Sequence, residues 1–189
     1  MLPSLARAQT AMTPFKEVQP QPDDAQRALI FFDFGCPVCA EYHERLVAWG
    51  TGLPRTWRAE FVPVTLPSKE SAVGARAFFA VAAADPAKLS AFMAAAYRRV
   101  HQGGMRRSEP AMWRAAVADA GVRGFDAAWA SVSQRQLEEA MAKLLAYGIN
   151  ATPSIAIGGR FVITPDNTNG DASLFFQLAN GMVSKAMSY

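Results

Sequence analysis

Two cysteines, Cys36 and Cys39, directly follow an apolar run, and this junction constrains the fold more than any other feature of the chain. Residues 28–34 have the length and aromatic content of a buried β-strand, whereas the apolar residues after Pro37 recur at helical spacing. The cysteines are therefore predicted where a strand turns into a helix, with Pro37 in the first helical turn. Unpaired N–H groups and the helix dipole favour an anion there, so Cys36 is a candidate thiolate of low pKa.

Length and composition restrict the class of protein. With 189 residues, of which 51% are hydrophobic, and a net charge of +3, the chain is long enough for one domain with a real core and an insertion. Charged residues or glycine interrupt each alanine-rich stretch, so we expect no membrane-spanning segment. Two cysteines cannot form a disulfide framework or a four-cysteine zinc site within one chain.

The first two thirds of the chain separate into three parts. Residues 1–26 are rich in proline and glutamine and are predicted as an N-terminal extension with an edge strand at 15–18. A Gly-Thr-Gly-Leu-Pro stretch at 50–54 ends the cysteine helix, and alternation at 57–64 predicts a second strand, parallel to the first. Residues 68–131 carry about four helical patterns and no strand signal, which indicates an inserted helical subdomain.

The last third returns to strands between two helices. A capping box at 133–136 begins a long helix that ends at Gly148. The glycine pair at 158–159 lies between two short apolar runs and predicts a β-hairpin. Either Asp171 or Ser173 can cap a terminal helix.

This order of elements outlines an α/β protein with a thioredoxin fold. Residues 27–67 and 132–189 would form the thioredoxin-like domain, and residues 68–131 would form the inserted helical subdomain. No internal repeat divides the chain further.

Cysteines separated by two residues at the start of a helix can form a reversible disulfide. Cys36, at the exposed first turn, would attack or be attacked, and Cys39 would resolve the mixed disulfide. A static structural disulfide and half of an intermolecular metal site are the alternatives. His43 is interpreted as a helix-surface or groove residue, because three metal ligands on one helix would leave an incomplete shell. We expect neither a metal nor a cofactor beyond the disulfide.

The sequence at 32–39, Phe-Asp-Phe-Gly-Cys-Pro-Val-Cys, followed across a helical block by Thr152-Pro153 and a Gly-Gly hairpin, resembles the DsbA family of thiol-disulfide oxidoreductases. In that family the corresponding proline is cis and lies against the active-site disulfide. The resemblance implies a site formed by the cysteine pair, the two residues between them and this dipeptide: Cys36, Pro37, Val38, Cys39, Thr152 and Pro153.

The resemblance also implies a cellular role. It predicts a monomeric periplasmic oxidase that passes a disulfide to reduced or misfolded proteins and is reoxidised by a quinone-linked membrane partner of the DsbB type. A reductase or isomerase with the same chemistry, and a non-enzymatic chaperone or binding module on a thioredoxin scaffold, are the alternatives.

Several residues depart from the family pattern. Val38 stands where the namesake oxidase has histidine, and Ile30 stands where thioredoxin-like proteins often have a buried acid, so the sequence leaves the oxidising strength open. Asp33 and Thr152 resemble the periplasmic isomerases, but the residues before the first strand cannot supply the dimerisation domain of those proteins. For Asp33 we consider two roles, assistance to proton transfer and hydrogen bonding to nearby backbone.

Two further patterns concern partners and location. A basic run surrounds a Gly-Gly turn and is interpreted as a solvated surface, not a nucleic-acid site, because net charge is low and no aromatic stacking motif accompanies it: Arg98, Arg99, His101, Arg106 and Arg107. Residues 6–8, Ala-Arg-Ala, fit the pattern before a signal-peptidase cut, and residues 1–5 are too short for a hydrophobic region. Either a signal peptide has been trimmed or the pattern is accidental, and because of what the cysteine motif implies we expect a trimmed signal peptide.

Overall fold

The computed structural model describes residues 14–65 and 68–188, so the Ala-Arg-Ala pattern lies outside the described residues. Its centre is a five-stranded sheet in the order β1-β5-β4-β2-β3. β2 and β3 pair in parallel, and the other three pairs are antiparallel. The strands are β1 Lys16–Glu17, β2 Arg27–Phe32, β3 Arg58–Pro63, β4 Ser154–Ile157 and β5 Phe161–Ile163.

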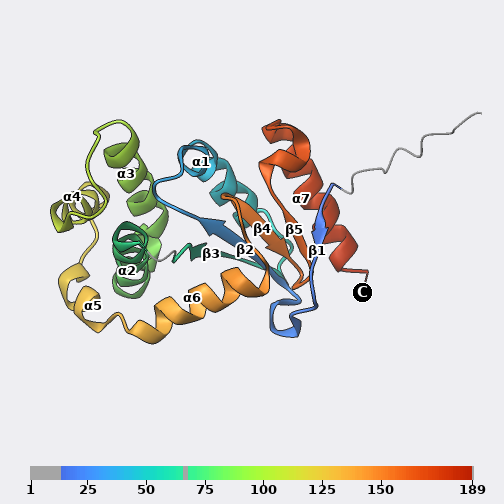
Figure 1. Ribbon diagram of the computed structural model, residues 1–189, viewed down its shortest axis with the longest axis horizontal. Helices are drawn as coiled ribbons and strands as arrows, with labels where there is room; N and C mark the ends of the chain where they lie inside the picture. The colour runs from blue at the N-terminus through green and yellow to red at the C-terminus, as the bar shows by residue number, and fades with distance from the viewer. Residues whose placement is uncertain (1–13, 66–67, 189) are drawn as a thin grey trace, which may run out of the picture.

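Helices cover both faces of the sheet and extend the molecule at one end (Figure 1). α1 Pro37–Thr51 and α7 Ala172–Ala186 lie on one face, and α6 Gln134–Ala146 lies on the other. The remaining helices gather beyond the sheet: α2 Lys69–Ala84, α3 Leu89–His101, α4 Pro110–Ala120 and α5 Phe125–Ser131. Short 3-10 turns occupy Pro22–Asp24, Pro86–Lys88 and Pro165–Thr168. The predicted thioredoxin fold with a helical insertion is confirmed.

The central strand β2 explains why the apolar run is continuous. It lies between β3 and β4, and helices cover both of its faces. Ile30 packs with α1 and α7, whereas Leu29 and Phe31 pack with α6. Burial on both faces requires apolar side chains at successive positions, and not the alternation of a half-exposed strand.

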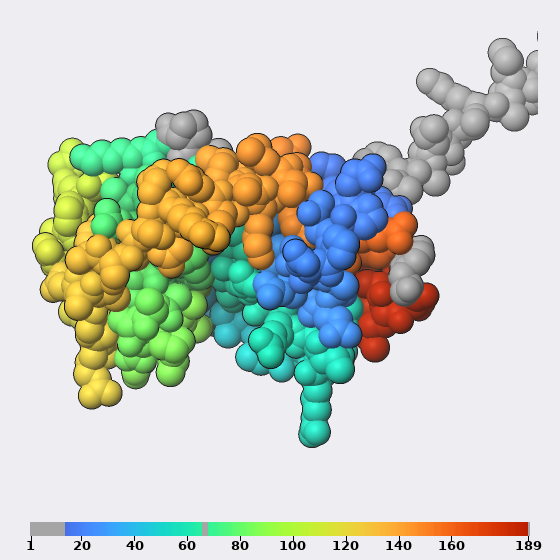
Figure 2. All heavy atoms as spheres, turned by 90° about the horizontal axis from the view of Figure 1, so that it is seen from below, coloured from blue at the N-terminus to red at the C-terminus, as the bar shows by residue number. Residues whose placement is uncertain are grey.

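The inserted helices have a core of their own, which joins the sheet at the end of β2. Phe32 and Phe34 pack into this cluster together with Cys39. In the view from below, the green and yellow helices of the insertion occupy one end of the molecule, opposite the red α7 (Figure 2). The cysteine pair therefore lies near the boundary between the two parts.

The N-terminal extension is attached to the β4–β5 hairpin. β1 pairs with β5, which confirms an edge strand close to the predicted position. The hairpin loop consists of residues 158–160, and Gly158 and Gly159 in it have φ of 61° and 68°, a conformation that glycine adopts without strain. A Cβ on Gly159 would lie 2.2 Å from the carbonyl oxygen of Gln21, so the extension passes too close for any side chain.

The helix ends follow the predicted signals. Ser133 and Gln136 form a reciprocal capping box at the start of α6. Asp171, and not Ser173, caps α7, because its carboxylate accepts the N–H groups of Ser173 and Leu174. Across the described stretches 14–65 and 68–188, every helix is too short or too polar to cross a bilayer.

Candidate active site

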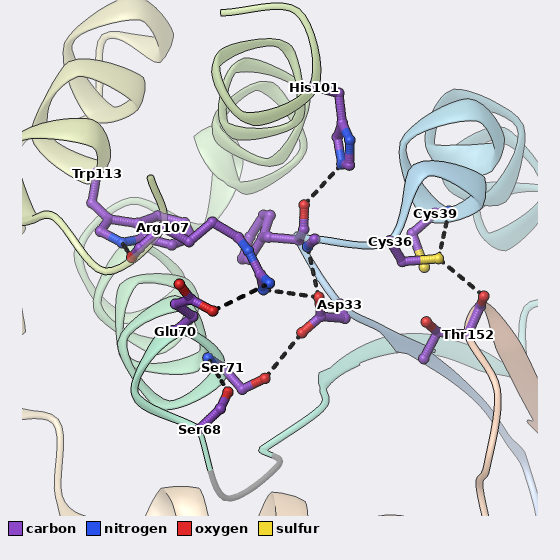
Figure 3. A network of polar contacts seen from close by, with 12 residues as sticks. Asp33, Cys36, Cys39, Ser68, Glu70, Ser71, His101, Arg107, Trp113 and Thr152 are labelled. Carbon is purple, nitrogen blue, oxygen red and sulfur yellow. Dashed lines mark hydrogen bonds and ion pairs between the residues drawn. The ribbon is translucent and has the colours of Figure 1, made fainter. Parts of the chain in front are cut away.

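The two cysteines lie beside Thr152 at the start of α1 (Figure 3). Cys36 is the N-cap residue, and its Sγ accepts a hydrogen bond from the Cys39 backbone N–H at 3.4 Å. The Cys36 thiol donates to the Thr152 carbonyl oxygen at 3.1 Å. The Thr152–Pro153 peptide bond is cis and Pro153 is buried. Residues 116 positions apart are thus brought into direct contact.

Pro37 and Val38 form the exposed first turn of α1 between the two cysteines. Pro37 is the first helical residue, where its missing N–H needs no partner. The Val38 side chain faces solvent and carries no charge, so only its backbone N–H acts on the neighbouring sulfur.

The two thiols differ in exposure and in acidity. Both are free, Cys36 is half-buried and Cys39 is buried. Hydrogen bonding from the Cys39 thiol, then from Thr152 and from the backbone N–H groups of Cys39 and Val38, outweighs burial and lowers the pKa of Cys36 to about 5. Burial, followed by the bond to Cys36 and its charge, raises the pKa of Cys39 far above the usual thiol range. The outer sulfur is therefore a thiolate at neutral pH and the inner one a thiol.

The source of this stabilisation differs partly from the sequence-based expectation. The sequence predicts that unpaired N–H groups and the helix dipole favour the thiolate. The N–H groups contribute, but hydrogen bonds from the Cys39 thiol and the Thr152 side chain have the larger effects on the pKa of Cys36. A histidine between the cysteines is therefore not needed for a low pKa.

Asp33 anchors the segment before Cys36 (Figure 3). Its Oδ1 accepts the Gly35 N–H at 2.6 Å and the Arg107 guanidinium at 2.9 Å, and its Oδ2 accepts the Ser71 hydroxyl at 3.2 Å. Hydrogen bonding to nearby backbone, one of the two roles considered for Asp33, is thus present. Assistance to proton transfer stays a prediction.

The interpretation of the basic run as a solvated surface is wrong for Arg107, whereas His101 is exposed although its ring is hydrogen-bonded. The Arg107 side chain is 22% exposed and pairs with Asp33, and the His101 ring donates from Nε2 to the Phe34 carbonyl oxygen at 3.0 Å. The Arg106 side chain, 80% exposed, does follow the prediction. The end of α3 and the loop between α3 and α4 place His101 and Arg107 against residues 33–35. This contact joins distant parts of the chain, so no local sequence pattern predicts it.

His43 is also placed differently from the prediction of a helix-surface or groove residue. It is only 3% exposed, because α3 and β3 cover this side of α1 and its ring packs against Phe61 and Tyr97. Its Nε2 donates to the Ser90 carbonyl oxygen at 3.1 Å. Burial lowers the pKa of His43. Among residues 14–65 and 68–188, no three His, Cys, Asp or Glu side chains gather closely enough to hold a metal ion.

Comparison with known proteins places this geometry in a family. A family model described as thioredoxin matches residues 22–172. The chain therefore belongs to the thioredoxin family. A comparison of the sequence with curated proteins found no match.

Solved structures similar to this chain include several DsbA proteins. DsbA of Pseudomonas aeruginosa superposes with a TM-score of 0.80 at 19% identity, covering 93% of each chain. DsbA of Xylella fastidiosa gives 0.76 at 23% identity, covering 93% of this chain and 96% of that chain. A variant of Proteus mirabilis DsbA, solved with the non-covalently bound peptide PWATCDS, gives 0.75 at 18% identity over 92% and 96% of the two chains. At these identities the likeness establishes the fold.

Proposed function

We propose that the protein is a thiol-disulfide oxidoreductase that acts as an oxidase on other proteins. The observation that carries this proposal is the asymmetry of the cysteine pair: an accessible thiolate at Cys36 beside a buried thiol at Cys39. A static disulfide needs no such difference. Disulfide exchange does need it, because the accessible sulfur forms the mixed disulfide, and the inner sulfur is the leaving group when the pair is reduced and the resolving thiol in the reverse direction.

The proposed reaction begins with the Cys36–Cys39 disulfide. A substrate thiolate attacks Cys36 Sγ, the S–S bond breaks, and Cys39 leaves and takes up a proton. A second substrate thiolate then attacks the substrate sulfur of the mixed disulfide and releases Cys36 as a thiolate. The substrate gains a disulfide and loses two electrons, which reduce the cysteine pair. Thr152 and Pro153 line the sulfur that receives the substrate.

The low pKa of Cys36 supports the oxidising direction. Stabilising the thiolate favours the reduced form of the pair, and a couple with a stable reduced form is a strong oxidant. The Proteus mirabilis relative solved with a peptide supports proteins as substrates. By the same resemblance we propose a periplasmic location, a monomeric state, reduced or misfolded substrate proteins, and a quinone-linked membrane reoxidant of the DsbB type.

Disulfide transfer to a reduced test protein checks this proposal. The oxidised wild type should form disulfides in the reduced test protein, and Cys36→Ser should abolish transfer. The matched variant Cys39→Ser, mixed with a test protein that already carries a disulfide, should accumulate mixed disulfides, because the Cys36 thiolate attacks that disulfide and no inner thiol resolves the product. If the wild type prevents aggregation of unfolded proteins and Cys36→Ser does so equally well, a non-enzymatic chaperone is the better description.

The reduction potential then decides the direction of exchange. A value near about −120 mV, as in DsbA, supports an oxidase, whereas a value near about −270 mV, as in thioredoxin, indicates a reductase or isomerase. Equilibration of the wild-type protein with glutathione buffers measures it.

A further inference from the structure

A cation from the insertion occupies the space beside the residues that precede Cys36. A Cβ on Gly35 would lie 2.3 Å from Arg107 Cζ and from one terminal nitrogen of the guanidinium. The glycine therefore leaves room for the guanidinium directly against the backbone. From this position Arg107 reaches Asp33 Oδ1 at 2.9 Å (Figure 3).

The helical subdomain fixes the position of this guanidinium. The Trp113 indole N–H donates to the Arg107 carbonyl oxygen at 2.8 Å, and Trp113 is fully buried in the core of the insertion. On the other side, Glu70 of α2 approaches the guanidinium at 3.9 Å. The Arg107 and Asp33 side chains are only 22% and 18% exposed, so water screens their charges less than at an open surface.

Asp33 lies three residues before the reactive Cys36, and the backbones of the two residues are hydrogen-bonded. The Cys36 backbone N–H donates to the Asp33 carbonyl oxygen at 3.1 Å. Burial, and then the charges of Cys39, Cys36 and Asp33, raise the pKa of Tyr97 on α3, so these groups act on one buried neighbourhood. An uncompensated carboxylate there would oppose a negative charge on Cys36. The charged and titratable groups around the segment are Asp33, Cys36, Cys39, Glu70, Tyr97, His101 and Arg107.

We propose that Arg107 is a positioning residue that compensates the charge of Asp33 beside Cys36, so that the inserted subdomain sets the oxidising strength of the cysteine pair. The inference rests on the proposed function. It assigns to the insertion an electrostatic part in the chemistry, in addition to any part in binding substrate.

Removing one charge at a time distinguishes this effect from a mechanical tether. Arg107→Gln leaves the carboxylate uncompensated and should disfavour the thiolate, whereas Asp33→Asn leaves the guanidinium uncompensated and should favour it. The double variant should return close to the wild type. A tether that only holds the loop would be weakened by both single changes, and both would then shift the pair in the same direction.

The expected size follows from Coulomb's law. If two unit charges are taken to be about 7 Å apart, removing one of them changes an equilibrium constant that depends on the other by a factor of about 3 in water. At an effective dielectric constant of about 20 the factor is about 50. We therefore expect Arg107→Gln to shift the glutathione equilibrium towards the disulfide form by about 3-fold to 50-fold. Asp33→Asn should shift it in the opposite direction. Titration of the thiolate absorbance at 240 nm should move accordingly, to higher pH for Arg107→Gln and to lower pH for Asp33→Asn.

Three further variants complete the test. Gly35→Ala should displace the guanidinium without removing it and should shift the titration in the direction of Arg107→Gln. Arg107→Lys keeps the charge and should restore most of the wild-type value. The matched control Arg106→Gln removes the neighbouring exposed cation, which pairs with Glu109, and should change neither measurement.

Shifts of the two single variants in the same direction, or a wild-type titration in Gly35→Ala, would overturn the inference. Its failure is separable from that of the proposed function, because thiolate titration needs no disulfide transfer. Opposite shifts in a protein that transfers no disulfides would remove the oxidase proposal and leave the charge arrangement standing. If the wild type transfers disulfides but the variants leave the thiolate titration unchanged, the proposed charge compensation is wrong and the oxidase proposal stands.

Discussion

The thioredoxin-like part and the insertion contact the cysteine segment in different ways. In the thioredoxin-like part, the Thr152 carbonyl and the Cys39 N–H contact the Cys36 sulfur through backbone, in addition to the Cys39 thiol and the Thr152 side chain. The insertion reaches the preceding residues through side chains, by the Arg107 guanidinium and the His101 imidazole. Backbone contacts persist when the sequence changes, whereas side-chain contacts depend on residue type. The fold therefore supplies the exchange chemistry, and the insertion can vary its environment.

The two parts also meet through an apolar contact at Phe34. Its ring lies within 5.0 to 5.9 Å, between centroids, of the rings of Phe32, Trp113, Tyr97 and Phe92. One residue between the strand and the cysteines thus connects the end of β2 with α3 and α4.

The largest expected loss of stability comes from breaking this contact. Phe34→Ala should reduce the free energy of unfolding by about 3–5 kcal/mol, because it removes a buried ring between two packed units. Urea unfolding measures the loss. The control Leu174→Ala, at a half-exposed position on α7, should stay within about 0.5 kcal/mol. A loss below about 1 kcal/mol for Phe34→Ala would mean that the two parts are joined elsewhere.

An intermediate effect is expected from two glycines that share positive φ and differ in their surroundings. Gly104, in the insertion, has φ of 61° and no atom within 4 Å of the place that a Cβ would take, so Gly104→Ala should cost about 1–2 kcal/mol. Gly159→Ala carries the same cost and also a clash with the Gln21 backbone. Its midpoint in thermal unfolding should be clearly the lower of the two. Equal midpoints would show that the close contact between Gly159 and the Gln21 backbone contributes nothing to stability.

The smallest effect concerns pH. Burial lowers the pKa of His43, so below about pH 6.5 the unfolded chain binds a proton that the folded chain resists. Stability should therefore fall as pH decreases through this range, by at most about 1.4 kcal/mol per pH unit for this group. His43→Gln should flatten this slope in urea unfolding measured from pH 7.5 to 5.5. An unchanged slope would show that the ring protonates in place.

Local signals in the sequence predicted most of the fold. The apolar run, the capping box at Ser133 and the glycine pair at Gly158 each determine a strand, a helix start or a turn from neighbouring residues alone, and the structure contains all three. Their order around a strandless block was enough to predict the insertion. Asp171 and Ser173 could not be separated, because aspartate and serine are both favoured N-cap residues.

The surroundings of the cysteines were less predictable. Cys36 and Cys39 follow from spacing, and Thr152 and Pro153 follow from the family resemblance. The pairing of Arg107 with Asp33 joins residues 74 positions apart, and neither residue carries a local sign of its partner. The one local hint of this pairing is Gly35, because a residue without a side chain leaves room for another group, here the Arg107 guanidinium, against the backbone. The prediction for His43 was wrong because a polar residue on a helix is usually exposed.

The two histidines give the junction a natural spectroscopic label. The chain contains two histidines, and His43 joins α1 to Ser90 at the start of α3, while His101 joins the end of α3 to Phe34. Both imidazoles therefore fasten the same helix, at opposite ends, to the segment that holds the cysteines. In a proton NMR spectrum of the unlabelled protein, every histidine ring signal would report on this one boundary in the oxidised and reduced states.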